Sequence, residues 1–192
     1  MRLFTLSLLL LAAFMLQGCF PLVATGVGAT AMMLDDRRTS GIYIEDENIE
    51  WKTLARTREK FKDAHINTTS YNLSVLLTGE APTEAMKNEI AEVVRGIPSV
   101  KAVTNEIAVS GNSSLTSRGN DTLITSSVKA RFIGNSAFSP NHVKVVTEAG
   151  VVYLMGLATQ LEGDAAAEVA RTTSGVTRVV KVFEYLAQAP KR

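Results

Sequence analysis

The sequence predicts an α+β protein of two tandem αββαβ domains, each a small mixed three-stranded sheet packed against two helices. Three observations lead to this prediction. Residues 66–79 align without a gap with residues 143–156, which indicates an internal repeat. Each copy continues into a helical pattern that ends near a Gly-Ile or Gly-Val pair, Gly96-Ile97 or Gly175-Val176. Each copy also has stretches rich in β-branched residues before and after that helix.

The first copy shows the elements in order. Asp46 or Asn48 is the expected N-cap of a helix, and residues 66–71 and 74–78 are expected to form a hairpin. The helix expected here shows apolar residues at helical spacing, namely Ile49, Leu54 and Phe61.

A second helix follows Pro82, and Gly96 is expected to take the left-handed conformation after it. Residues 100–109 form the last expected strand. The second helix should turn one apolar face to the sheet, formed by Met86, Ile90, Val93, Val94 and Ile97.

The second copy follows the same order. Thr159 and Glu162 form a predicted capping box, Gly175 ends the helix, and residues 179–186 form the closing strand. Because Leu73 stands where the second copy has Gly150, the two hairpin turns are expected to differ. The residues of this helical segment expected to face inward are Leu161, Ala165, Val169 and Val176.

The first residues have the pattern of a lipoprotein signal. Arg2 gives a short positive start, residues 3–16 are almost wholly apolar, and Leu16-Gln17-Gly18 leads into Cys19, the one cysteine of the chain. A cysteine directly after the cut resembles a lipobox, in which the thiol is loaded with diacylglycerol. Two or three acyl chains then anchor a protein stably, whereas one anchors it only marginally.

The alternative for this region is a transmembrane helix through residues 3–34, which is long enough to span a bilayer. Glycines and a proline interrupt that stretch, and its apolar part before Gly18 is too short to span alone. Phe20 rather than Asp follows Cys19, and in lipoproteins of this type the lack of an Asp indicates the outer membrane.

Composition shifts set the expected boundaries. The stretch between the two copies is rich in Gly, Ser and Asn and is expected to be a flexible linker, while Asp35–Arg38 is expected to enter water. Domains this small are expected to pack on each other. The segments are the signal peptide 1–18, the lipidated tether 19–45, the first domain 46–109, the linker 110–119, the second domain 120–187 and the C-terminal tail 188–192.

Charge and motifs exclude several function classes. The formal net charge is +1, with 20 basic and 19 acidic residues, so nucleic acid is not an expected partner. No nucleophile elbow, phosphate-binding loop or HExxH motif occurs, and we expect no enzyme, no cofactor and no metal site. His65 and His142 precede equivalent strands, which indicates a shared structural role.

Three stretches carry a resemblance to a known family. They are Asn120 to Thr125, Asn141 to Val145 and Val151 to Leu157, reading NDTLIT, NHVKV and VVYLMGL. With the αββαβ pattern, they resemble the BON domain of bacterial envelope proteins. Two such domains behind a lipobox are similar to dual BON-domain outer-membrane lipoproteins, a phospholipid-binding family, and the resemblance covers residues 16–19 and 46–187.

The resemblance implies that the second domain binds anionic phospholipid, that the protein supports outer-membrane integrity, and that no accepted catalytic residue is present. It also implies a localisation at the outer membrane, lipid-anchored and facing the periplasm. This sequence departs from the family at one place. Leu123 stands where the family pattern has an aromatic residue, so the group that would enter the membrane is smaller here.

A helix expected at about 121–133 could provide the phospholipid-binding surface that the resemblance implies. Ile124, Val128 and Phe132 lie four residues apart and should face the core. A second, nearly uncharged side of the helix could rest among lipid headgroups, flanked by two cations. The predicted lipid-binding residues are Leu123, Ser127, Lys129, Ala130, Arg131, Ile133 and Gly134.

The alternative is that Leu123 and Ile133 pack against the first domain or against another protein. The chain would then be an interaction adaptor for an outer-membrane or cell-division assembly, without direct recognition of lipid.

Overall fold

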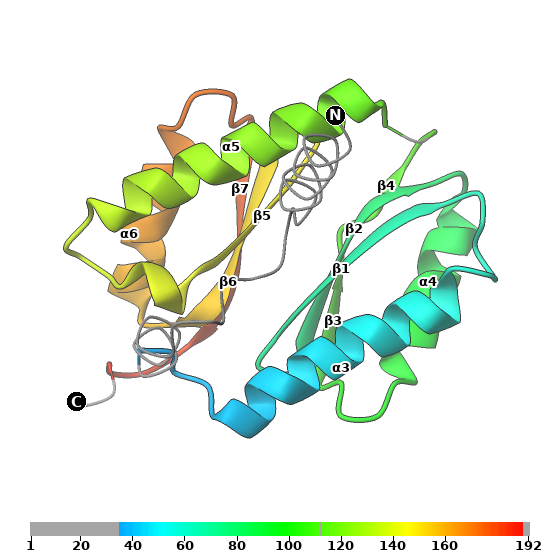
Figure 1. Ribbon diagram of the computed structural model, residues 1–192, viewed down its shortest axis with the longest axis horizontal. Helices are drawn as coiled ribbons and strands as arrows, with labels where there is room; N and C mark the ends of the chain where they lie inside the picture. The colour runs from blue at the N-terminus through cyan, green and yellow to red at the C-terminus, as the bar shows by residue number, and fades with distance from the viewer. Residues whose placement is uncertain (1–34, 112, 190–192) are drawn as a thin grey trace, which may run out of the picture. The chain divides into compact units, whose positions relative to one another are not determined.

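A computed structural model describes residues 35–111 and 113–189, so the signal sequence and Cys19 lie outside the described residues. The predicted α+β class is confirmed (Figure 1). The first repeat consists of α3 (Ser40–Thr57), β1 (His65–Tyr71), β2 (Ser74–Ala81), α4 (Glu84–Arg95), β3 (Ala102–Asn105) and β4 (Ala108–Val109). The second repeat consists of α5 (Leu115–Ile133), the 3₁₀ turn η1 (Pro140–His142), β5 (Lys144–Glu148), β6 (Val151–Ala158), α6 (Gln160–Arg171) and β7 (Arg178–Tyr185).

Each sheet is built around the second strand of its repeat. Strand β2 pairs antiparallel with β1 and parallel with β3, and β6 pairs in the same way with β5 and β7. The first sheet has a fourth short strand, β4, because the expected strand 100–109 is interrupted. Asn105 causes the interruption: its Nδ2 donates to the Lys87 carbonyl (2.9 Å) and its Oδ1 accepts from the Ile107 N–H (3.3 Å).

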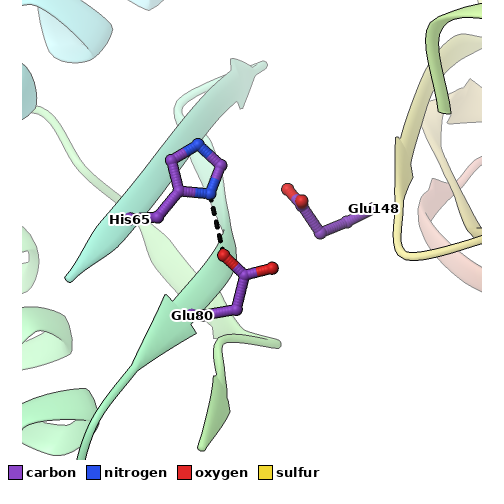
Figure 2. Close-up of side chains that lie close together, drawn as sticks. All are labelled: His65, Glu80 and Glu148. Atoms are coloured by element: carbon purple, nitrogen blue, oxygen red, sulfur yellow. Dashed lines mark hydrogen bonds and ion pairs between the residues drawn. The ribbon is translucent and has the colours of Figure 1, made fainter. Parts of the chain in front are cut away.

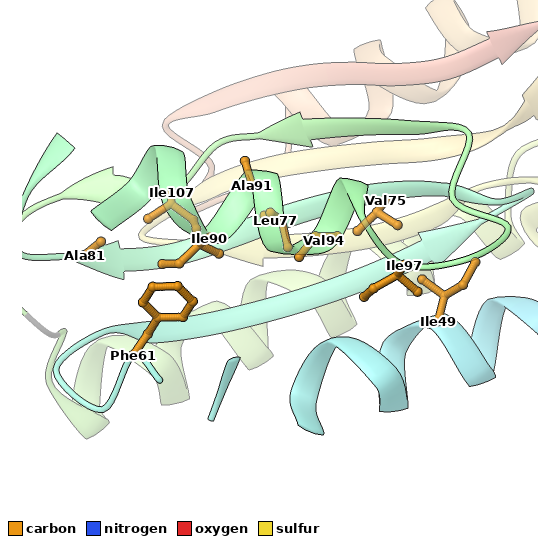
Figure 3. Packing of buried hydrophobic residues seen from close by; sticks show 10 residues of the cluster. All are labelled: Ile49, Phe61, Val75, Leu77, Ala81, Ile90, Ala91, Val94, Ile97 and Ile107. Atoms are coloured by element: carbon orange, nitrogen blue, oxygen red, sulfur yellow. The ribbon is translucent and has the colours of Figure 1, made fainter. Parts of the chain in front are cut away.

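Alternation along β2 and β6 sends side chains to two different cores. Val75 and Leu77 pack under α4, against Ile90 and Val94 (Figure 3). On the opposite faces, the two sheets meet in a separate cluster of Tyr71, Leu76, Tyr153, Met155 and Leu157. We call this contact between the two sheets the seam, and it confirms that the two domains pack on each other.

A buried aspartate joins the first helix of each repeat to the hairpin turn. Asp46 accepts hydrogen bonds from the N–H groups of Asn72 (2.9 Å) and Leu73 (2.8 Å). Asp121 accepts the corresponding bonds from Ala149 (2.9 Å) and Gly150 (2.8 Å). We call each of these arrangements an aspartate clamp.

The aspartate clamp corrects two expectations about helix starts. Asp46 is not an N-cap, because α3 begins at Ser40, where the Thr39 hydroxyl accepts from the Ile42 N–H. Helix α5 begins at Leu115, capped by Ser114, so residues 115–119 of the expected linker are helical. In both helices the aspartate lies in the interior and points at the turn.

The expected difference between the hairpin turns is wrong. Asn72 and Leu73 have φ of 52° and 67°, and Ala149 and Gly150 have φ of 49° and 75°. Positive φ at both central residues is the type I′ pattern in each case. Leu73 is held in a conformation that disfavours a side chain, and the hydrogen bond from its N–H to Asp46 helps to hold it there.

The glycines that follow α4 and α6, Gly96 and Gly175, differ in backbone conformation. Gly96 has φ of −78°, so the expected left-handed conformation at that position is wrong. The left-handed residue comes four positions after each helix end, and it is Ser99 in one repeat and Gly175 in the other. Helix α6 itself ends earlier than Gly175, at Arg171, while the capping box of Thr159 and Glu162 is confirmed.

Leu161 does not face inward, because 83% of it is exposed. Gly163 shows why: a Cβ there would lie 3.1 Å from Phe183 and 3.1 Å from Tyr185, so this side of α6 lies close against β7. The buried side of α6 consists of Gly163, Ala166 and Ala170. No helix within residues 35–111 and 113–189 combines the length and apolarity needed to cross a bilayer.

Residues 35–38, which we call the strap, do not simply enter water but bind both domains. Arg37 donates to the Leu157 carbonyl (2.7 Å) and forms a two-pronged ion pair with Glu162. Arg38 pairs with Asp46 (2.9 Å) and stacks 4.0 Å from the centre of the Tyr71 ring. The strap therefore joins α6 of the second domain to the aspartate clamp of the first.

Replacing Asp46 with alanine should lower the free energy of unfolding by about 3 kcal/mol, because two N–H groups, a hydroxyl and Arg38 lose their acceptor. Urea unfolding followed by circular dichroism measures this loss. The exposed Asp63 is a control, and Asp63→Ala should change stability by less than about 0.5 kcal/mol. Equal effects of both substitutions would contradict a structural role for the aspartate clamp.

The strap should make stability depend on acid. Hydrogen bonds from Arg37, and to a smaller extent from Thr159, lower the pKa of Glu162 from 4.5 to about 2. The contribution of the Arg37–Glu162 pair is therefore complete above pH 4.5 and is lost as the pH falls toward 2. The difference in unfolding free energy between the unaltered protein and Arg37→Ala should be about 1 kcal/mol at neutral pH, because solvent screens the pair and Thr159 contributes part of the shift. This difference should shrink between pH 4.5 and 2. Arg171→Ala, which breaks an exposed ion pair with Glu168, should show little of this effect. A difference independent of pH for Arg37→Ala would refute this role.

Candidate functional site

Helix α5 is oriented by its buried side. Ile124, Val128 and Phe132 lie in the core of the second domain, as their spacing predicts. The opposite side therefore faces out, and Leu123 and Ile133 are 67% and 77% exposed. Because exposed apolar side chains on one side of a helix form a candidate contact surface, the outward side of α5 is the first candidate for function.

The outward side forms one uncharged band along the helix. At 100° per residue, Leu123, Ser127, Ala130 and Gly134 follow one another within about 60° of the circumference, and all four are exposed. Leu115 extends the apolar surface at the start of the helix and is 83% exposed. The structure thus places five of the seven predicted residues, including Ile133, on a common outer surface, which we call the α5 face.

The alternative in which Leu123 and Ile133 pack against the first domain is wrong, because both side chains are exposed. The first domain makes its seam contacts with β6 and its neighbours instead. Contact with another protein remains an alternative for the α5 face.

The two predicted cations behave differently from the apolar residues. The Arg131 guanidinium is used within the domain: it donates to the Val169 carbonyl (2.9 Å) and to the hydroxyls of Thr173 (2.7 Å) and Thr172 (3.0 Å). These bonds tie the C-terminal end of α6 to α5. Arg131 therefore has a structural role within the domain. A lipid phosphate that bound Arg131 would have to compete with these three acceptor groups.

Lys129 lies on the other flank of α5, where it lines a cavity of about 500 Å³ together with Arg118, Thr122, Thr125 and Ser126. Its side chain is exposed, so it can reach an anion at the surface. Neither predicted cation has a carboxylate partner within 4.0 Å among the described residues, but only Arg131 spends its donors on hydrogen bonds within the domain.

The predicted lipidation residue, Cys19, lies outside the described residues. The point at which the chain enters the described part is nevertheless well held. The Asp35 carbonyl lies 2.8 Å from His142 Nε2, and the Asp35 carboxylate accepts from Ser139. Both partners belong to η1 and its cap, which contacts α5.

His142 and His65 share a backbone role as well as their positions. A Cβ on Gly79 would lie 2.0 Å from the His65 carbonyl oxygen, and one on Gly156 would lie 2.1 Å from the His142 carbonyl oxygen. Each histidine carbonyl therefore needs a glycine opposite it. The sequence signal for this was the glycine that closes both copies of the repeat.

Known proteins give the same two-part division. The BON domain model matches residues 46–111 and 120–187. The outer membrane lipoprotein DolP of Haemophilus influenzae is 35% identical over 184 residues, which cover 94% of this chain and 95% of that protein. The 21 kDa hemolysin of Actinobacillus pleuropneumoniae is 34% identical over 154 residues, covering 79% of each chain.

A third relative is more distant. The osmotically-inducible protein Y of Escherichia coli is 28% identical over 144 residues, covering 72% of each chain. Because the family model covers more than half of the chain and falls on both repeats, the chain belongs to the BON domain family and carries two BON domains.

Proposed function

We propose that the protein is anchored to the outer membrane through acylated Cys19, faces the periplasm, and binds anionic phospholipid through the α5 face, thereby helping to maintain envelope integrity. The observation that carries this proposal is the exposure of Leu123 and Ile133 on an uncharged helix side. A relative of nearly equal length that is named an outer membrane lipoprotein supports the location.

The place where the chain enters the described part supports the same arrangement. Asp35 is bound to η1, beside the C-terminal end of α5 where Ile133 is exposed. The sixteen residues from Cys19 to Asp35 can span at most about 55 Å. An anchored chain would therefore keep the α5 face within reach of the membrane that holds Cys19.

The affinity expected of the α5 face is low. Burying Leu123 and Ile133 among acyl chains is worth about 2 kcal/mol each, and Lys129 near an anionic surface adds about 1 kcal/mol. The total corresponds to a dissociation constant of roughly 0.2 mM. Such binding is useful because the anchor raises the effective concentration of membrane.

A second candidate function is a protein-interaction adaptor for an outer-membrane or cell-division assembly. The engagement of Arg131 within the domain favours it, since the α5 face then has one free cation rather than two. Vesicle binding separates the two candidates.

Leu123→Asp should weaken binding of the fragment from Asp35 onward to phosphatidylglycerol vesicles by about thirtyfold, since it removes about 2 kcal/mol of apolar transfer. Co-sedimentation measures the change. Leu161 is a matched control, because it is an exposed leucine of the same domain on α6, and Leu161→Asp should bind normally.

The charge of the lipid is tested with the same assay. Lys129→Glu should weaken binding to phosphatidylglycerol vesicles by about thirtyfold, since reversing one charge costs about 2 kcal/mol. It should leave weak binding to phosphatidylcholine unchanged. Unaltered binding of both Leu123→Asp and Lys129→Glu, or equal failure of the unaltered protein on both kinds of vesicle, would favour the adaptor.

Acylation is tested by mass spectrometry of the protein from membranes. The mature chain should begin at Cys19 and carry a diacylglycerol group with a further acyl chain, and Cys19→Ala should keep its leader. An unmodified thiol with the leader attached would rule out the lipid anchor.

A further inference from the structure

Ionisable side chains of both domains meet at one end of the seam. Glu80 follows the alternation of β2 onto the seam side and is only 4% exposed. It lies opposite His65 in the pairing of β1 with β2, and His65 Nδ1 is 2.9 Å from Glu80 Oε2. The first domain thus presents an imidazole and a carboxylate side by side.

The second domain adds another carboxylate. Glu148, at the end of β5, is 7% exposed and points toward the pair (Figure 2). One ligand atom from each of His65, Glu80 and Glu148 lies within 4.8 Å of the others. The Asn67 amide donates to Glu148 Oε2 (2.7 Å) and holds this carboxylate across the seam.

The two carboxylates of the cluster have few direct ion-pair partners, although Lys129 and Arg118 line the adjoining cavity. Among the ion pairs of residues 35–111 and 113–189, His65 is the only basic partner of Glu80, and Glu148 has none. Burying two carboxylates is costly unless cations or hydrogen bonds compensate them. Beyond the imidazole contact and the amide of Asn67, a bound cation would meet this need.

We propose that His65, Glu80 and Glu148 bind a divalent transition-metal cation, with zinc as the best match. One imidazole nitrogen and two carboxylate oxygens form a ligand set that zinc accepts at 2.0–2.2 Å. Calcium prefers six to eight oxygens and magnesium a nearly complete octahedron of oxygens, so the imidazole argues against both.

The geometry needs only a modest adjustment to bind the metal. Ligand atoms of a tetrahedral zinc site lie roughly 3.3 Å apart, so atoms as far apart as 4.8 Å must approach by side-chain rotation. Asn67 then acts as an outer partner that orients Glu148. His65 and Glu148 also line the cavity of about 500 Å³, which leaves room for water at the remaining position.

The site would link the two domains, since two ligands come from the first and one from the second. The second repeat has no counterpart of the His65–Glu80 pair. Leu157 stands in the second repeat where the first has Glu80, and His142 binds the strap instead. Lys129 and Arg118 line the same cavity, so their charge opposes the metal and Lys129→Ala should strengthen binding.

The test uses the whole chain in detergent, stripped with EDTA and carrying Cys19→Ala so that the one thiol cannot bind metal. Calorimetric titration with zinc should give one site per chain, and zinc should raise the melting temperature. Glu148→Gln should weaken binding at least tenfold. Glu106→Gln is the matched control, because Glu106 contacts Arg178 of the other domain outside this cluster, and it should bind zinc as the unaltered protein does.

Cobalt provides a second readout, since Co²⁺ in a site of low coordination number absorbs visible light strongly. Loss of this absorption in Glu80→Gln would support the site if Glu148→Gln fails to fold. The proposal is overturned if zinc does not bind, if Glu148→Gln and Glu80→Gln bind it normally, or if His142→Asn rather than these variants abolishes binding.

Discussion

The hydrogen bonds from two hairpin N–H groups to one buried helix carboxylate set the geometry of each domain. Asp46 and Asp121 accept these bonds in the two repeats. A carboxylate pointing at the turn fixes the rotation of its helix about the axis. Leu123 follows Asp121 by two residues, or about 200°, so the side that contacts the hairpin and the side that bears Leu123 are nearly opposite. The exposure of the α5 face is thus a consequence of the aspartate clamp as well as of the buried stripe.

Periodicity accounts for what the sequence could predict. The stripe of Ile124, Val128 and Phe132 repeats every four residues, and the repeat revealed two domains before any contact was known. Leu161 differs from its prediction because it lies in the first turn of α6, where the close packing of Gly163 on β7 sets the inward side. The sequence predicts Asp46 to be an N-cap, because an aspartate near an expected helix start is more often a cap than a buried acceptor.

Neither the helical periodicity nor the internal repeat predicts contacts between residues that are far apart in the sequence. Arg37 and Glu162 are separated by 125 positions, and Asn67 and Glu148 by 81. The four charged residues 35–38 predict a solvated segment, because no residue near them in the sequence indicates a binding partner. Glu80 lay directly beyond the aligned repeat, at a place where the second copy has Leu157. The internal repeat therefore predicts the αββαβ elements that the two copies share. It does not predict the roles of charged residues, such as Glu80, that occur in one copy alone.

The two domains therefore differ in the surfaces and charged groups that they present. The second domain presents its first helix with an uncharged outer band, and the first supplies the histidine and one carboxylate of the seam. The proposed lipid contact is worth only a few kcal/mol, so it depends on the proposed anchor to raise the effective concentration of membrane. The strap holds the entry of the chain beside η1. One flank of α5 shares a cavity with β1 of the first domain, while Leu123 and Ile133 stay exposed. The contacts between the domains and with the strap order α5 before any ligand arrives. A surface that is already ordered spends little of a small binding free energy on its own ordering.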